Sequence, residues 1–185
     1  ADSYLGYMSK GGGALSEHSH ALNLWQHFAR VLGHGKVAKV QASSKLYFNG
    51  QVEYDEASFL NLETETGFIG RCVQDVTTNP PEKFVKVGFS GGNVRLDIAA
   101  NRELVTYLHL GAQKSEELTK TRPDDFITEL KHIHKIINNS NQDSPISSKY
   151  GLETALVIAA AHQSAKLGKV VNVDYENGFN LSSLV

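Results

Sequence analysis

The middle of the chain alternates short strand-like segments with turn-forming residues, and this alternation constrains the fold more than any other feature of the sequence. From Val40 to Phe48 apolar and polar residues alternate with a period of two, and the segment ends at the hairpin-forming pair Asn49-Gly50. Similar segments, each followed by turn residues, predict further strands over 57–64, 67–77, 83–89, 93–99 and 102–110. Because short turns join antiparallel neighbours, we expect an antiparallel meander.

Helices are predicted before and after this meander in the sequence. Apolar residues recur at helical spacing over 16–32, and Gly33 then provides a stop. Two further helices are predicted over 123–138 and over 152–167, and a short last strand over 170–173. The predicted fold class is α+β: an open, mainly antiparallel sheet of about six to seven strands with helices packed on one face.

The length of 185 residues, of which 41% are hydrophobic, predicts a single domain that spans residues 1–185 and buries a hydrophobic core. The 18 basic and 20 acidic residues are mixed along the chain, which argues against nucleic acid or an anionic membrane as a partner. Apolar runs such as 155–161 are much shorter than the roughly 20 residues that span a bilayer, and no signal peptide opens the chain. We therefore expect a cytoplasmic location, with the single Cys72 as a buried strand thiol.

A run of three glycines, Gly11 to Gly13, stands directly before a predicted helix start that carries groups able to move protons. Glycine lets the backbone turn at positive φ or approach a ligand closely, and Ser16 could cap the first helical turn. Glu17 and His20 would then fall one turn apart on the same helix face, where a carboxylate beside an imidazole forms a candidate acid/base pair. The alternative is that His20 is an ordinary surface histidine.

The glycine run does not form a dinucleotide-binding fingerprint. A G-x-G-x-x-G motif would need a third glycine where the chain has Ser16, and it would follow an apolar strand that is not predicted here. The sequence also contains no phosphate-binding loop and no paired cysteines for zinc. A metal site of His18, His20 and His27 is disfavoured because their side chains would point from different helix faces. The sequence therefore predicts no residues of this chain that bind a cofactor or a metal.

Three segments resemble those of one family of oxidoreductases. The residues GGGALSEHSHALNL, at 11–24, are similar to the GGG-x-L-x-E-x-S-H-E-x-D-x-L segment of the glucose-fructose oxidoreductase/inositol dehydrogenase (Gfo/Idh/MocA) family, in the variant common among nucleotide-sugar and nonulosonic-acid pathway members. Residues 125–132 resemble the family's M-Y-x-x-E-L-x-x-F helix, and residues 151–168 resemble its closing G-L-x-A-L-x-V-x-x-A-A-x-x-S-A-x-x-G helix. The order and spacing of the three segments agree over nearly the whole chain.

The resemblance implies that the chain is the C-terminal, substrate-binding and oligomerisation half of an NAD(P)-dependent oxidoreductase that acts on a sugar, a nucleotide sugar or a cyclitol. The family's N-terminal Rossmann half, which holds NAD or NADP, does not lie within these residues, and the chain begins without methionine. We expect the chain alone to bind no NAD(H) and to turn over no sugar. We also expect its uncovered sheet face to pair with a second copy in a dimer or tetramer.

The resemblance also implies roles for individual residues. His20 would exchange a proton with the hydroxyl or carbonyl that undergoes hydride transfer, with Glu17 as its acidic partner. The substrate site would be lined by Lys10, Gly12, Gly13 and Asn23, the last in place of the family's aspartate. The lysine could reach an anionic substrate group or simply be solvated. Two other functions stay open: a non-catalytic sugar-sensing regulator and a structural dimerisation module of the same fold.

Overall fold

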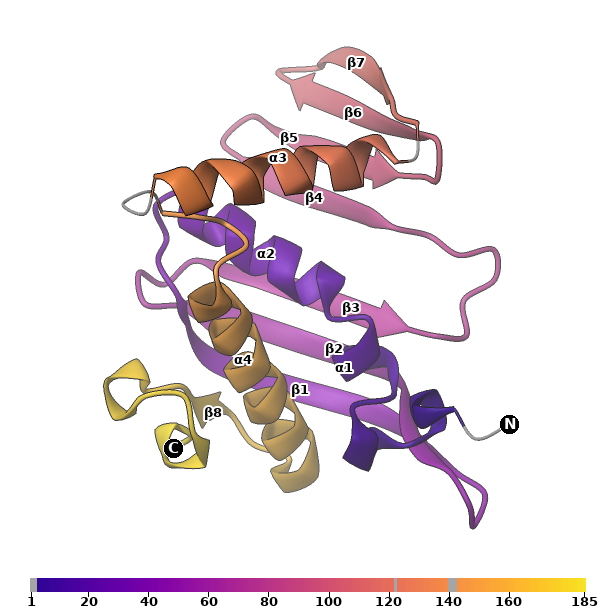
Figure 1. Ribbon diagram of the computed structural model, residues 1–185, viewed down its shortest axis with the longest axis vertical. Helices are drawn as coiled ribbons and strands as arrows, with labels where there is room; N and C mark the ends of the chain where they lie inside the picture. Colours follow the sequence, from indigo (N-terminus) through magenta and orange to yellow (C-terminus); the bar gives the residue numbers. More distant parts are fainter. Residues whose placement is uncertain (1–2, 122, 140–142) are drawn as a thin grey trace. The chain divides into compact units, whose positions relative to one another are not determined.

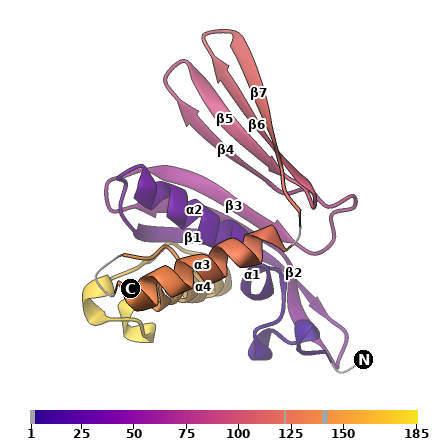
Figure 2. The ribbon, with the colours of Figure 1, turned by 45° about the horizontal axis from the view of Figure 1, so that its top comes forward.

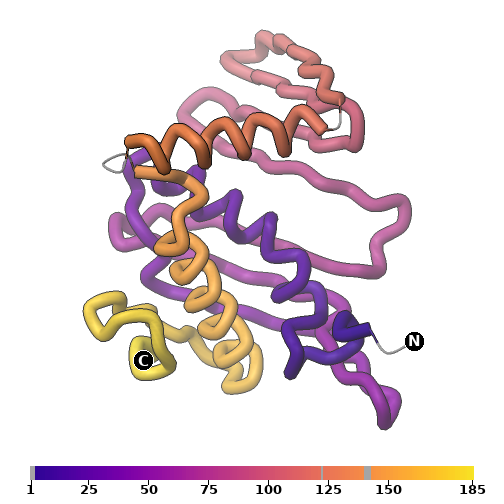
Figure 3. Tube along the Cα trace, viewed as in Figure 1, coloured from indigo at the N-terminus to yellow at the C-terminus, as the bar shows by residue number. Residues whose placement is uncertain are grey.

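The computed structural model describes residues 3–121, 123–139 and 143–185 (Figure 1, Figure 3). The chain divides into two compact units. The first unit combines Ala1–Thr77 with Pro145–Val185, and the second is Thr78–Ser144. Each unit is built around its own four-stranded sheet. The α+β class predicted from the sequence is confirmed by these two antiparallel sheets and by the four α-helices of the described residues.

The sheet of the first unit has the strand order β3-β2-β1-β8, and its neighbours are antiparallel. These strands are β1 (Val37–Phe48), β2 (Glu53–Thr64), β3 (Ile69–Asp75) and the short β8 (Val171–Asn172). Three helices cover one face of this sheet: α1 (Ala14–Glu17), α2 (His20–Val31) and α4 (Ser148–Leu167) (Figure 1). The predicted packing of helices on one sheet face is therefore found in this unit.

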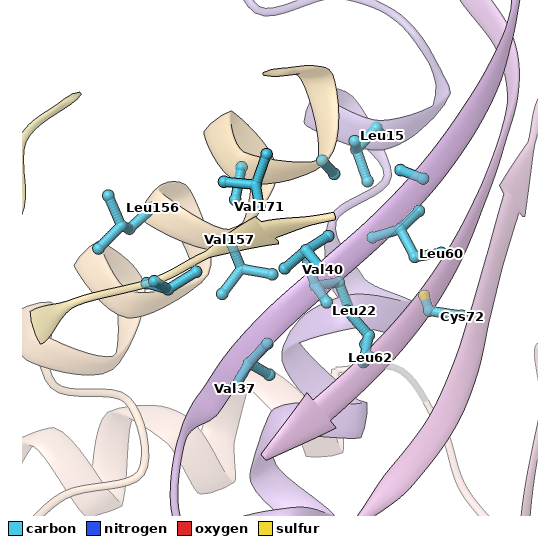
Figure 4. Packing of buried hydrophobic residues seen from close by; sticks show 14 of the residues in the cluster. Leu15, Leu22, Val37, Val40, Leu60, Leu62, Cys72, Leu156, Val157 and Val171 are labelled. Carbon is cyan, nitrogen blue, oxygen red and sulfur yellow. The ribbon is translucent and has the colours of Figure 1, made fainter. Parts of the chain in front are cut away.

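The core of the first unit lies between this sheet face and the three helices (Figure 4). Val40 and Ala42 of β1 are buried while Gln41 between them is exposed, as the period of two predicts. From the helices, Leu22 and Val157 are fully buried against the strands. Full burial of a side chain of this size contributes about 1.5–3 kcal/mol, so the sheet–helix interface stabilises this unit.

Cys72 of β3 belongs to the same core, with 5% of its surface exposed, which confirms the predicted buried thiol. Burial raises the pKa of its thiol to about 12, because the charged thiolate loses its hydration. The thiol is therefore protonated at neutral pH and is a poor nucleophile.

The second unit contains a meander in which each strand pairs with the next along the chain (Figure 2). Its strands are β4 (Phe84–Phe89), β5 (Gly92–Ile98), β6 (Arg102–His109) and β7 (Ala112–Thr119), and α3 (Asp124–Asn138) follows them. No residue of these four strands or of α3 is buried. The apolar side chains of this unit are therefore left uncovered within the described residues.

The prediction of one sheet with six to seven strands is wrong, because the described strands form two sheets of four. The break falls between β3 and β4, where the chain contains Pro80 and Pro81. Proline has no N–H to donate to a strand ladder, so the pairing does not continue through this segment. Sequence analysis also missed β7, whose eight residues are all exposed and carry no apolar alternation that would mark a strand.

The predicted continuous helix over 16–32 is also interrupted. The structure ends α1 at Glu17 and starts α2 at His20, so that His18 and Ser19 form a break between them. Ser16, predicted as a cap, lies inside α1, and Gly13 occupies the N-cap position. Among the described residues, no helix combines the length and the apolar character needed to cross a lipid bilayer.

A buried carboxylate connects α2 with α4. Glu153 is only 1% exposed, and its Oε2 accepts a hydrogen bond of 2.8 Å from Arg30 Nη2. Its Oε1 lies 3.6 Å from Lys36 Nζ. Both cations are partly exposed, at 27% for Arg30 and 32% for Lys36. Arg30 also stacks on the ring of Tyr150, 3.5 Å from its centroid. The acid is thus the desolvated member of this cluster, whereas each cation reaches water.

This difference in exposure predicts that removing the arginine destabilises the protein more than neutralising the glutamate. Arg30→Met should lower the free energy of unfolding by about 3 kcal/mol, because it leaves a buried carboxylate without its best partner. Glu153→Gln should cost only about 1 kcal/mol, because the two cations left behind are solvated. Urea unfolding of the variants measures both values. Lys39→Met, which breaks the exposed Lys39–Glu63 pair, is the control and should cost under about 1 kcal/mol. A cost for Glu153→Gln equal to that for Arg30→Met would contradict this account.

Candidate functional site

The glycine run forms a tight loop that packs against the chain's own backbone. Gly13 has a φ of 97°, in the left-handed region that favours glycine. The N–H of Gly12 donates to the carbonyl of Tyr7 at 3.0 Å, and the N–H of Gly13 donates to that of Leu5 at 3.2 Å. A Cβ on Gly12 would collide with the carbonyl of Leu5, and one on Gly13 with the carboxylate of Asp55. Glycine is therefore required at both positions, because neighbouring atoms of the chain lie too close for a Cβ.

Two polar side chains from the sheet fix the loop and the helices that follow it. Asp55 of β2 is fully buried, and its Oδ2 accepts from the backbone N–H of Leu15 and from the hydroxyl of Ser58, both at 2.8 Å. Gln74 of β3 accepts from the N–H of Leu22 at 3.0 Å and donates to the carbonyl of Ala14 at 3.0 Å. Because Gln74 bonds to α1 and α2 together, it replaces the hydrogen bonds lost where the helix breaks.

Glu17 and His20 lie on opposite sides of that break. Glu17 ends α1, and its Oε2 accepts a hydrogen bond of 2.7 Å from the hydroxyl of Tyr4. His20 is the first residue of α2 and is exposed. No hydrogen bond joins His20 to Glu17 among the interactions of the described residues, so the acid's direct partner is Tyr4 rather than the predicted imidazole.

Tyr4 is a candidate site residue that sequence analysis missed. The hydrogen bond to Glu17 raises the pKa of Tyr4, so the phenol stays protonated and acts as a donor. Tyr4 and Glu17 are 13 residues apart, and Tyr4 belongs to a short 3₁₀ turn, Tyr4–Gly6, outside any predicted helix. No periodic pattern links such positions, so only the folded chain brings them together.

The residues predicted to line the substrate site differ in their accessibility. Lys10 is exposed, and its ammonium lies 4.2 Å from the centroid of the Tyr7 ring. Asn23 uses its side-chain amide to donate to the hydroxyl of Thr154 in α4, at 3.0 Å. Gly12 and Gly13 are buried. Of the four, Lys10 is therefore the side chain that is free to reach a ligand, while the others support the local structure.

The arrangement places three groups that can transfer or hold protons around the start of α2: the exposed imidazole of His20, the carboxylate of Glu17 and the phenol of Tyr4. A histidine changes its charge near neutral pH, which suits general acid/base chemistry. Within the described part of the chain, no three His, Cys, Asp or Glu side chains are grouped in a way that could hold a metal ion.

Comparison with known proteins finds similarity in structure but not in sequence. No protein-family model matches the chain, and no curated protein matches its sequence. An aldose-aldose oxidoreductase from Caulobacter crescentus, solved with glycerol, matches with a TM-score of 0.75 and 20% identity over 93% of this chain and 51% of that chain. Levoglucosan dehydrogenase in its apo form matches with a TM-score of 0.74 and 16% identity over 92% of this chain and 54% of that chain.

A third solved structure is an oxidoreductase from Agrobacterium radiobacter in complex with NAD+, L-tartaric acid and magnesium. It matches with a TM-score of 0.67 and 18% identity over 91% of this chain and 51% of that chain. The chain therefore spans about half the length of each of these enzymes. At these identities the likeness shows a shared fold: the chain folds like one half of these oxidoreductases.

The loop geometry predicts unequal effects for Gly11 and Gly13, which both have a positive φ but differ in ψ, at 12° and 173°. Gly11→Ala should cost about 1 kcal/mol, because its φ of 86° disfavours alanine while its Cβ would meet open space. Gly13→Ala should cost at least about 3 kcal/mol, because its φ of 97° and ψ of 173° lie in a region adopted almost only by glycine and its Cβ would also displace the buried carboxylate of Asp55. Urea or thermal unfolding of the two variants measures the difference. Equal costs would contradict the role assigned to Asp55.

Proposed function

We propose that this chain is the substrate-binding half of an NAD(P)-dependent oxidoreductase of the Gfo/Idh/MocA family, acting on a sugar, a nucleotide sugar or a cyclitol. The observation that carries the proposal is the exposed His20, which starts α2 after the glycine loop and α1, in a fold shared with half of several oxidoreductases. The resemblance of residues 11–24 to the family segment supports the same assignment.

In this proposal the dinucleotide is held by a Rossmann half. The described residues fit this division, because the N–H groups of Gly12 and Gly13 are already bonded within the chain and do not cradle a pyrophosphate. The nicotinamide, when bound, supplies or accepts the hydride. The present chain would contribute the substrate contacts and the proton-transfer group.

His20 would take the proton of a substrate hydroxyl during oxidation and return it to the carbonyl during reduction. Its place at the first residue of α2 leaves the imidazole exposed, while Leu22 in the same helix turn is fixed by Gln74. A backbone held in this way fixes the position of the His20 Cα, from which the imidazole would reach the substrate. Glu17 would orient Tyr4 by accepting its O–H, so that the phenol oxygen can accept a hydrogen bond from a substrate hydroxyl.

A second candidate function is a sugar-sensing regulator that binds ligand without turnover. The observation that favours it is Asn23, which replaces the family's aspartate and bonds to Thr154 rather than pointing free toward a ligand. An enzyme and a regulator differ in one measurable way, because only an enzyme oxidises or reduces the sugar that it binds.

The proton-transfer role of His20 predicts a loss of turnover in the whole enzyme. His20→Ala should lower kcat by about 10²–10⁴-fold with a smaller change in KM, because the step loses its general acid/base. The assay uses NAD(P)+ with a panel of aldoses, nucleotide sugars and inositols, and the fastest substrate is taken for the variants. His18→Ala is the matched control, because His18 is an exposed histidine at the helix break. Wild-type turnover by His20→Ala would contradict the assignment.

The uncovered sheet of the second unit supports a proposal about assembly. Along the strands, register and alternation place six apolar side chains on one face: Val85, Val87, Val94, Leu96, Val105 and Tyr107. None of them is buried, although an apolar patch of this kind is usually covered. We propose that a second copy of the chain packs on this apolar face, giving the dimer or tetramer expected from the resemblance.

Charge placed on this face should weaken self-association. Val105→Lys puts an ammonium on the apolar face, and desolvating it on assembly should weaken self-association at least about tenfold. Thr106→Lys is the matched control, because the adjacent residue of β6 points to the opposite face of the sheet. Sedimentation at micromolar concentration measures both. A monomeric wild-type chain, or equal behaviour of the two variants, would contradict the proposal.

A further inference from the structure

The sequence contains two Asn-Gly pairs, Asn49-Gly50 and Asn177-Gly178, and the structure places them in different surroundings. In such a pair the backbone nitrogen of glycine can attack the side-chain amide carbon of asparagine, because glycine has no side chain that hinders the approach. The attack is fastest when the backbone nitrogen is free, the amide carbon is electron-poor and the departing NH₂ group is not held. The two pairs differ in all three respects.

The first pair lies in the turn that joins β1 to β2, where its reacting groups are available (Figure 1). Asn49 and Gly50 are both exposed, so water reaches them. Among the described residues, no hydrogen bond involves the backbone N–H of Gly50 or the side-chain Nδ2 of Asn49. The attacking nitrogen and the departing group of this pair are therefore both unrestrained by the protein.

Two backbone N–H groups polarise the side-chain carbonyl of Asn49. Its Oδ1 accepts hydrogen bonds from the N–H of Gln51 and from the N–H of Val52, both at 3.0 Å. Attack on the amide carbon converts this oxygen into an oxyanion, and donors already aimed at it stabilise the developing charge, as in an oxyanion hole. The turn thus activates the amide of Asn49 with its own backbone.

The second pair follows the short 3₁₀ turn Tyr175–Asn177, where its reacting groups are held. The backbone N–H of Gly178 donates to the carbonyl of Tyr175 at 3.2 Å. The Nδ2 of Asn177 donates to the carboxylate of Asp174 at 2.6 Å. In the described part of the chain, no hydrogen bond polarises the Oδ1 of Asn177. Attack at this pair must first break existing hydrogen bonds, which raises its barrier.

We propose that Asn49 is a self-modifying site that water converts to aspartate and isoaspartate, whereas Asn177 stays intact in the folded protein. The Gly50 nitrogen gives up its proton and bonds to the amide carbon of Asn49, and the bond from that carbon to Nδ2 breaks. Nδ2 leaves with the proton as ammonia. Water then opens the cyclic imide at either carbonyl and returns a proton to the Gly50 nitrogen. The net reaction consumes one water, releases one ammonia and adds one carboxylate to the hairpin, and it does not rest on the proposed oxidoreductase activity.

The test is incubation of the folded protein at pH 8, followed by peptide mapping with mass spectrometry. Asn49 should convert at least about tenfold faster than Asn177, because its amide is activated and its reacting groups are free. In water enriched in heavy oxygen, the new carboxylate should carry one heavy oxygen atom. Asn49→Gln is the control and should abolish the conversion in this peptide, because its longer side chain forms the cyclic imide much more slowly.

Unfolding in urea separates the effect of the structure from that of the sequence. Both pairs lose their hydrogen bonds in the unfolded chain, so their rates should become similar. In the folded protein, Asp174→Ala releases the amide of Asn177 and should speed conversion there about threefold or more, with no change at Asn49. Circular dichroism checks that this variant folds. Equal rates at the two pairs in the folded wild type would overturn the proposal, as would a difference that persists in urea.

Discussion

The buried carboxylate of Asp55 is the contact on which the candidate site depends. It accepts the backbone N–H of Leu15, at the start of α1, and its position requires glycine at residue 13. Gln74 repeats this arrangement one strand away, where it bonds to both helices across the break between them. The sheet thus holds the start of both helices through two buried polar side chains. Oδ2 of Asp55 accepts two hydrogen bonds, whereas its buried Oδ1 has no hydrogen-bond partner among the described residues.

The helix break changes the geometry of the candidate site. A continuous helix would place Glu17 and His20 on one face, but the break separates them and lets the hydroxyl of Tyr4 bond to the acid. The groups able to move protons are therefore collected from three segments: a 3₁₀ turn, the end of α1 and the start of α2. Sites built in this way depend on the scaffold beneath them, here β2 and β3 with α4 tied to α2 through Glu153.

The two units differ in how much of their apolar surface they bury. The first unit buries Leu22, Val40 and Val157 between a sheet and its helices. The second has a regular antiparallel register yet buries no strand residue. Backbone pairing alone leaves both faces of such a sheet exposed to water, and the hydrophobic effect then favours covering the apolar one. This is the physical basis of the proposal that a second copy of the chain covers that face.

Local patterns in the sequence were enough to predict most strands, the helix over 123–138, the α+β class and the burial of Cys72, because side-chain periodicity depends on near neighbours. They also singled out the glycine run and His20. The division into two sheets, the charged strand β7 and the helix break at His18 depended on pairings between distant segments, which no local period encodes. The same holds for Tyr4 beside Glu17 and for Asp55 under Gly13. Only tertiary structure decides such contacts, because a side chain's hydrogen-bond partner is set by which segments the core brings together.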